Sequence, residues 1–221
     1  MFTHLDHLIV AVDDLEAAAK NYQTLFGMTQ VWSGEHKELG TSNALFAFKN
    51  TYFELLSATG EGLGADLVNH YLNQSGEGLI GIVFATDDIK KAKSSLEEQG
   101  FNMPDISSGE GINSSDQQVR RWKNLFLPPE LSRGLFSFII EHTEGALPSP
   151  MAYEPSSPHS LDHVHNVFRR FRDIRGIEKN SRSYYKDDVF FATDEQVYAV
   201  KTCCGWRACE GYNFVKPIKE T

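Results

Sequence analysis

Ionisable side chains interrupt apolar stretches of the sequence at three places where they could do chemistry. His7 stands in "LDHLIVAV", Glu54 in "YFELL" and Glu141 in "FIIEH". A carboxylate that is buried without a partner costs several kcal/mol, so each glutamate needs a metal ion, an arginine or water from an open pocket. One histidine and two carboxylates suit a divalent ion such as Zn²⁺, Mn²⁺, Fe²⁺ or Ni²⁺, with water at the open positions.

The apolar stretches around these residues are typical of β-strands, in which side chains alternate between two faces. On this pattern His7 shares a face with Ile9, whereas Leu8 and Val10 point the other way, toward a helix. Glu54 and its apolar neighbours alternate in the same manner. We therefore predict that the ionisable side chains share one cavity.

Two segments of the chain repeat the same order of elements. "VDDLEAAAKNYQTLFGM" begins at Val12 and "TDDIKKAKSSLEEQGF" begins at Thr86, and each follows a strand-like stretch. In both segments an aspartate is placed to cap the helix N-terminus and a glycine to end the helix. Further strand-like stretches follow each helix. The sequence therefore predicts an α+β fold with two β-α-β-β-β modules, whose helices begin near Asp13 and Asp87.

This pattern resembles the vicinal-oxygen-chelate superfamily of glyoxalases, bleomycin-resistance proteins and extradiol dioxygenases over residues 4–143. The opening "HLDHLIVAVDDLEAAAKNYQTLFGM" carries the more specific match. "EHKELGTSNALFAF" and "VRRWKNLFL" with "LFSFIIEH" are similar to the glyoxalase-like subgroup. The resemblance implies that the paired modules form a cupped mixed sheet around one pocket.

The chain changes character after Pro148, where a Pro/Ser-rich connector begins. "SLDHVHNVF" then repeats "HLDHLIVAV" with His163 at the place of His7, but the residues that follow do not complete a third module. We expect a first module with a connecting helix over 1–76 and a second module over 77–147. A degenerate C-terminal extension over 148–221 is expected to pack on the modules.

The resemblance implies metal ligands on the first and last strands of each module. His7 lies seven residues before the capping Asp14, and the same count back from Asp88 gives Gly81, so the second module lacks its first-strand ligand. The remaining implied ligands are Glu54 and Glu141, which are also the candidate catalytic bases. Water, His163 or His36 would take the place that Gly81 leaves open.

Four further residues are candidates for contact with a ligand: His36, Asn43, Arg121 and Trp122. Arg120 or Arg121 could neutralise Glu141, and Trp122 could stack on an aromatic ligand. Asn43 resembles the subgroup's pattern, and His36 lies in an expected loop that could reach the site. Each also has a structural interpretation, as part of an exposed strand, the core or a turn. His142 is expected to face away from Glu141 and to be structural.

Composition excludes several classes of function. The net charge of −9 argues against nucleic acid as a partner. The sequence shows neither a signal peptide nor a membrane span, so we expect a cytoplasmic protein with no membrane partner. A basic run over 169–186 is interpreted as a solvated face or a contact with the acidic body. Cys203, Cys204 and Cys209 form a poor disulfide framework and are expected to be reduced.

Two classes of function remain. The first is a glyoxalase-like protein that binds a hydrophobic or aromatic small molecule, with or without a divalent metal and as a monomer or homodimer. The alternative is a metal-dependent lyase or isomerase in which the ion stabilises an enediolate-type intermediate and Glu54 or Glu141 acts as base. An extradiol dioxygenase is disfavoured because it needs a second first-strand histidine, where Gly81 stands.

Overall fold

The computed structural model describes residues 2–128, 131, 135–146, 161–166, 188–193 and 197–201. The chain divides into two compact units, Met1–Ser160 and Leu161–Thr221. None of the helices in these described stretches is long and apolar enough to span a membrane.

The first unit contains the predicted β-α-β-β-β order twice, which confirms the α+β fold class. The first module consists of β1 (Leu5–Ala11), α1 (Leu15–Phe26), β2 (Trp32–His36), the 3-10 helix η1 (Lys37–Leu39), β3 (Thr41–Ala47) and β4 (Tyr52–Ala58). The second consists of β5 (Gly78–Ala85), α3 (Ile89–Glu98), β6 (Ser107–Asn113), β7 (Val119–Phe126) and β8 (Phe136–Glu144). Helix α2 (Leu63–Ser75) connects the modules.

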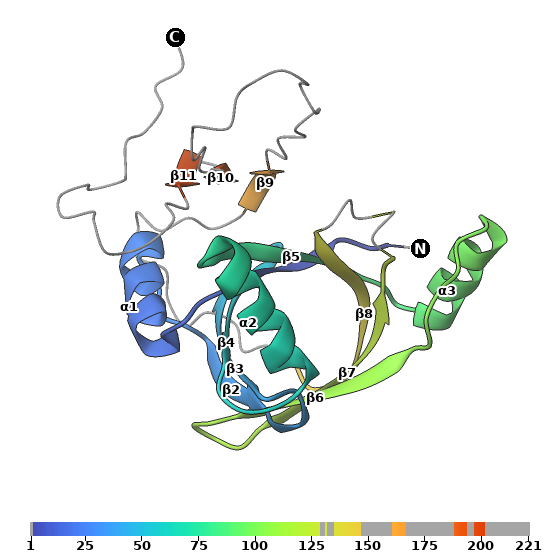
Figure 1. Ribbon diagram of the computed structural model, residues 1–221, viewed down its shortest axis with the longest axis horizontal. Helices are drawn as coiled ribbons and strands as arrows, with labels where there is room; N and C mark the ends of the chain where they lie inside the picture. Colours follow the sequence, from blue (N-terminus) through green and yellow to red (C-terminus); the bar gives the residue numbers. More distant parts are fainter. Residues whose placement is uncertain are drawn as a thin grey trace, which may run out of the picture. The chain divides into compact units, whose positions relative to one another are not determined.

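The strands close into a barrel in the order β1-β4-β3-β2-β6-β7-β8-β5 (Figure 1). Strand β1 is parallel to β4, and β5 is parallel to β8, so the modules have equivalent pairings. Antiparallel pairs β1–β5 and β2–β6 join the modules at both edges. The cupped sheet expected from the sequence is therefore closed, because each module covers the free edges of the other.

Helices α1 and α3 lie on opposite sides of the barrel (Figure 1). Asp14 accepts a hydrogen bond from the backbone N–H of Ala17 (3.0 Å) at the start of α1. Asp88 accepts one from the N–H of Lys91 (2.9 Å) at the start of α3. These are the N-caps that the repeat predicts. Gly27 ends α1 in the left-handed conformation (φ 62°).

Alternation along β8 separates two apolar clusters. Phe138 and Ile140 pack in the interior cluster with Ile9 of β1. Ile139, between them in sequence, packs in a second cluster with Ile89 of α3. The side chains of β8 therefore divide between the barrel interior and the α3 side.

The second unit contains an antiparallel sheet in the order β11-β10-β9. Its strands are β9 (Leu161–Asn166), β10 (Asp188–Thr193) and β11 (Val197–Lys201). These bounds confirm the predicted strand around His163 and the predicted hairpin of "DVFFAT" with "QVYAVK". The basic run 169–186 and the cysteines at 203, 204 and 209 lie outside the described residues, and packing of the extension on the modules stays a prediction.

Candidate functional site

His7 lies at the centre of a buried polar network on β1. Its Nδ1 is 2.6 Å from Oδ1 of Asp6, and its Nε2 is 3.3 Å from Oε2 of Glu54 on β4. The side chain of His7 is 3% exposed, and those of Asp6 and Glu54 are 6% and 9% exposed. Because a carboxylate only accepts hydrogen bonds, an imidazole that donates to two carboxylates carries a proton on each nitrogen. The geometry therefore favours the doubly protonated, cationic form of His7.

The pKa directions agree with this geometry. Burial by itself lowers the pKa of His7, but hydrogen bonds to Asp6 and Glu54 outweigh burial and raise the pKa above its ordinary value. Burial raises the pKa of Glu54, but the bond from His7 brings that pKa below its usual value. The two carboxylates thus favour the charged form of His7, and the imidazolium favours the ionised form of Glu54.

Asp6 links His7 to a second histidine. Its Oδ2 lies 3.0 Å from Nε2 of His142 on β8. Burial raises the pKa of Asp6, but hydrogen bonds from His142 and His7 hold it well below its usual range. Regular alternation would place Asp6 and His7 on opposite faces of β1, but the register of the β1–β5 pairing shifts between Leu5 and His7. Asp6 was not among the predicted site residues, because this shift leaves no local signal in the sequence.

Asn43 and His36 support Glu54 from β3 and β2. The Nδ2 of Asn43 donates to Oε1 of Glu54 (2.7 Å) and approaches Nε2 of His36 (3.3 Å). Burial lowers the pKa of His36, so its ring is neutral, with the proton on Nδ1 directed at Oγ1 of Thr41 (3.1 Å). The expectation that His36 lies in a loop is wrong, because His36 is the last residue of β2 and is buried.

Aromatic rings surround the same part of the barrel. The rings of His7 and Tyr52 are stacked, with centroids 4.4 Å apart. The ring of Trp122 lies edge-on to His36, with centroids 5.6 Å apart. The guanidinium of Arg120 lies 5.4 Å from the centroid of Trp32 and 5.8 Å from that of Tyr52.

Arg121 does not share this interior position. Its Nε donates to Glu110 (2.7 Å), and its Nη1 donates to Glu144. The side chain of Arg121 is 46% exposed, whereas residue Arg120 is 6% exposed. Arg121 therefore faces solvent and Arg120 faces the interior, since neighbouring residues of a strand face different sides, and a ligand contact at Arg121 stays a prediction.

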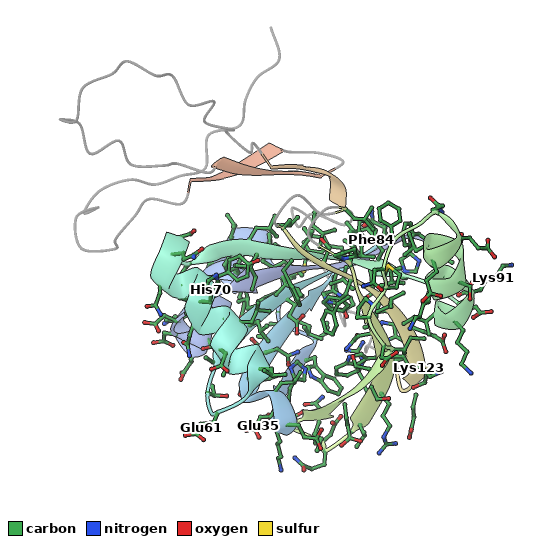
Figure 2. All side chains as sticks on the ribbon, turned by 45° about the vertical axis from the view of Figure 1, so that its right-hand side comes forward. Glu35, Glu61, His70, Phe84, Lys91 and Lys123 are labelled. Carbon is green, nitrogen blue, oxygen red and sulfur yellow. The ribbon has the colours of Figure 1, made fainter. Side chains whose placement is uncertain are left out.

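Glu141 does not converge with His7 and Glu54, contrary to the prediction. Its Oε2 accepts from the backbone N–H of Ile89 (2.8 Å) at the start of α3, and its Oε1 accepts from Nζ of Lys123 (3.0 Å). Figure 2 labels Lys123 on β7 and Lys91 on α3, at the same side of the barrel. Glu141 follows the alternation of β8 to the α3 side, where its carboxylate stabilises the helix N-terminus.

The register of the strands identifies the true counterpart of Glu54. Ile9 pairs with Glu54 in the parallel pair β1–β4. Its counterpart Val83 pairs with Phe138 in the parallel pair β5–β8. The second module therefore carries Phe138 where the first carries Glu54, just as it carries Gly81 where the first carries His7.

A backbone carbonyl group and apolar side chains occupy the space beside Gly81. A Cβ at this position would lie 3.1 Å from the carbonyl oxygen of Phe136 and 3.2 Å from Cδ1 of Ile9. A larger side chain at Gly81 would have to displace these neighbours. His163 lies on β9 of the second unit, and its contribution to the site stays a prediction.

The donor set does not fit the divalent metal that the resemblance implies. Only the first module supplies donors at the ligand positions, and both nitrogens of His7 already face carboxylates. Within the described residues, no group of three or more His, Cys, Asp or Glu side chains is arranged to hold a metal ion. His7 and Glu54 alone do not complete a metal site of the usual four donors.

Comparisons with known proteins connect this geometry to a family. The sequence model of the glyoxalase-like domain family matches residues 5–176, which is more than half of the chain. The ethylmalonyl-CoA/methylmalonyl-CoA epimerase of Cereibacter sphaeroides is 30% identical over 110 residues, which cover 50% of this chain and 79% of the relative.

Solved structures share the fold at lower identity. A methylmalonyl-CoA epimerase of Streptomyces coelicolor in complex with 2-nitronate-propionyl-CoA has a TM-score of 0.50 and 20% identity, covering 65% of this chain and all of its own. The Mycobacterium tuberculosis methylmalonyl-CoA epimerase has a TM-score of 0.51 and 21% identity, covering 65% of this chain and 90% of its own. The family match, together with the paired modules, establishes that the chain belongs to the glyoxalase-like domain family of the vicinal-oxygen-chelate superfamily.

Proposed function

We propose that this protein is an isomerase that moves a proton at the carbon next to a carbonyl group, with acyl-CoA thioesters as its substrate class. The observation that carries the proposal is the buried pair of His7 and Glu54, an imidazolium and a carboxylate 3.3 Å apart on neighbouring strands. Such a pair offers a base and a cation at one place, which is what enolate chemistry requires. The relative named as an ethylmalonyl-CoA/methylmalonyl-CoA epimerase supports the choice of substrate.

Glu54 acts as the base in this proposal. Its carboxylate takes the proton from the α-carbon, the electron pair of the C–H bond forms the C=C bond of an enolate, and the carbonyl oxygen gains the negative charge. His7 then donates its Nε2–H to that oxygen. A water molecule from solvent then gives a proton to the opposite face of the planar enolate, which inverts the carbon, and the proton held by Glu54 neutralises the hydroxide that remains.

The hydrogen bond of His7 explains how a carboxylate with a lowered pKa can serve as base. In the resting protein His7 bonds to Glu54 and thereby lowers its pKa. When this bond moves to the enolate oxygen, Glu54 loses its stabilising cation and becomes more basic as the proton is transferred. Asp6 keeps the imidazole oriented and charged through Nδ1, and Asn43 holds the second oxygen of Glu54.

Deuterium exchange tests the proposal. Methylmalonyl-CoA and ethylmalonyl-CoA are incubated with the protein in D₂O, and mass spectrometry measures deuterium at the α-carbon. Glu54→Gln should slow exchange by about 10²–10⁴-fold, the usual contribution of a general base. Glu141→Gln is the matched control and should retain the rate of the unaltered protein, because Glu141 bonds to Lys123 and to α3.

Two results would contradict the proposal. One is exchange no faster than in buffer for either thioester with the unaltered protein. The other is an equal exchange rate for the unaltered protein and Glu54→Gln. Exchange should also survive dialysis against a chelator, because the second module carries Gly81 and Phe138 at the ligand positions.

The second candidate function is the binding of a hydrophobic or aromatic small molecule without turnover. The observation that favours it is the apolar replacement of both second-module ligand positions, by Gly81 and by Phe138, which lies in the apolar cluster against which Trp122 packs. Saturable binding of a thioester without deuterium exchange would support this function over the isomerase.

A further inference from the structure

Arg120 is a buried cation that has no anionic partner in the described part of the chain. The residue is 6% exposed, and its Nε is buried without a hydrogen-bond partner. No ion pair joins it to a carboxylate among the described residues. Buried charges in proteins are normally paired, because removing a charge from water is expensive. The position therefore suits an anion.

The neighbouring arginine shows that side chains of β7 can reach carboxylates on other strands. Arg121 is exposed and contacts both Glu110 and Glu144. The two buried carboxylates among the described residues, Asp6 and Glu54, are already engaged by histidines and by Asn43. Among the residues that the structure describes, the surface arginine thus has two carboxylate partners and the buried arginine has none.

Aromatic rings hold Arg120 next to the His7 network. Its guanidinium lies over the rings of Trp32 (5.4 Å) and Tyr52 (5.8 Å), and Tyr52 stacks on His7. Trp32 lies flat on β2 because residue 34 is glycine: a Cβ at Gly34 would be 2.3 Å from the indole Nε1. The arginine is therefore fixed by packing and cation–π contacts, and its unpartnered Nε–H is left as a preformed donor.

We propose that Arg120 binds a carboxylate of the ligand, so that the substrates are small molecules bearing a free carboxylate in addition to the reacting carbonyl group. This inference rests on the proposed function, since it assigns a second group of the same substrate. A guanidinium suits this role because it donates to carboxylates in a fixed planar geometry. The guanidinium also supplies a positive charge within the barrel, where the incomplete ligand set does not fit a metal ion.

Propionate and propionamide are the test probes, because they have nearly the same shape and differ in charge. Titration calorimetry of the full chain should detect propionate binding and at least tenfold weaker binding of propionamide. Arg120→Gln should weaken propionate binding at least tenfold, whereas Arg121→Gln should leave it unchanged. Equal propionate affinity for Arg120→Gln and the unaltered protein would overturn the proposal, as would equal affinity of the two probes.

A second variant separates anion binding from a structural role. Arg120→Met keeps an unbranched apolar side chain and removes a buried charge that has no anionic partner among the described residues, so its urea midpoint without ligand should equal or exceed that of the unaltered protein. Propionate should raise the midpoint of the unaltered protein but not that of Arg120→Met. A large fall in midpoint for Arg120→Met, with no effect of propionate on either protein, would overturn the proposal in favour of a structural cation.

The two proposals can fail separately. Glu54→Gln should slow deuterium exchange by about 10²–10⁴-fold while it retains propionate binding, because Arg120 is unchanged. Propionate binding that depends on Arg120, in a protein that shows no exchange, would refute the isomerase and leave the carboxylate site standing. Exchange that depends on Glu54 but not on Arg120, without propionate binding, would refute the carboxylate site alone.

Discussion

Replacement of Asp6 by asparagine should strongly destabilise the folded protein, although it changes only one oxygen of the side chain to an NH₂ group. Asp6 accepts hydrogen bonds from His7 (2.6 Å) and His142 (3.0 Å), and it is 5% exposed. Asparagine has the same shape but no charge, and it retains one acceptor oxygen. The imidazolium of His7 would lose one of the two anions that keep it charged inside the barrel.

The size of the effect follows from the burial of the pair. Removing one partner of a buried ion pair costs about 3–5 kcal/mol, and the remaining amide acceptor places Asp6→Asn near about 3 kcal/mol. In a chain of this size 1 kcal/mol corresponds to roughly 2–4 °C in Tm, so the variant should melt about 6–12 °C lower.

Urea unfolding at pH 6, followed by tryptophan fluorescence, measures the free energy of unfolding. Glu141→Gln is the control: it changes a carboxylate that is partly exposed and bound to Lys123 and α3, and it should cost about 1 kcal/mol. A loss below about 1 kcal/mol for Asp6→Asn, or a loss equal to that of the control, would refute the buried ion network.

Three further outcomes follow from the same structure. The pKa of His7 is raised above 6.5. The contribution of the charged His7 to stability should therefore be complete below pH 6.5 and be lost as the pH rises through the folded-state pKa. His7→Gln should flatten this part of a plot of unfolding free energy against pH. At the acid end the lowered pKa of Glu54 should preserve stability above pH 4.5 and lose it as the pH falls through the folded-state value. Gly81→Ala should lower the free energy of unfolding in urea by about 1–3 kcal/mol, because the new Cβ has neighbours at 3.1 and 3.2 Å. Gly60→Ala is the control and should be nearly neutral, because a Cβ there first meets an atom at 3.5 Å. Ending the chain at Ser160 should leave a folded barrel with a lower urea midpoint if the extension packs on the modules; an unchanged midpoint would contradict that packing.

Local signals in the sequence were sufficient for the modules. Asp14 and Asp88 mark the starts of α1 and α3, and the alternation in "HLDHLIVAV" places His7 in the barrel interior with Ile9. Closure of the barrel depends on pairs between strands of different modules, such as β1 with β5, and these distant pairs leave no local pattern. The sequence therefore predicted the elements and not the closure.

The errors in the candidate site have one physical origin, which is the face on which a strand residue lies. Glu141 matched an aliphatic setting like that of Glu54, but the pairing of β5 with β8 places Phe138 at the equivalent position. Arg120 and Arg121 are neighbours, and only the contacts show which of them is buried. Period-two patterns identify two faces but do not say which one lines the site.

The protonation state of His7 tests the central claim most directly, because both the structure and the proposed chemistry require a buried imidazolium. Nitrogen NMR of the histidine rings between pH 5 and 9, with His7 assigned through His7→Gln, reports the proton on each ring nitrogen. We expect His7 to carry both protons at pH 6.5 and to titrate above it, while His36 stays neutral with its proton on Nδ1. A neutral His7 ring at pH 6 would contradict the account.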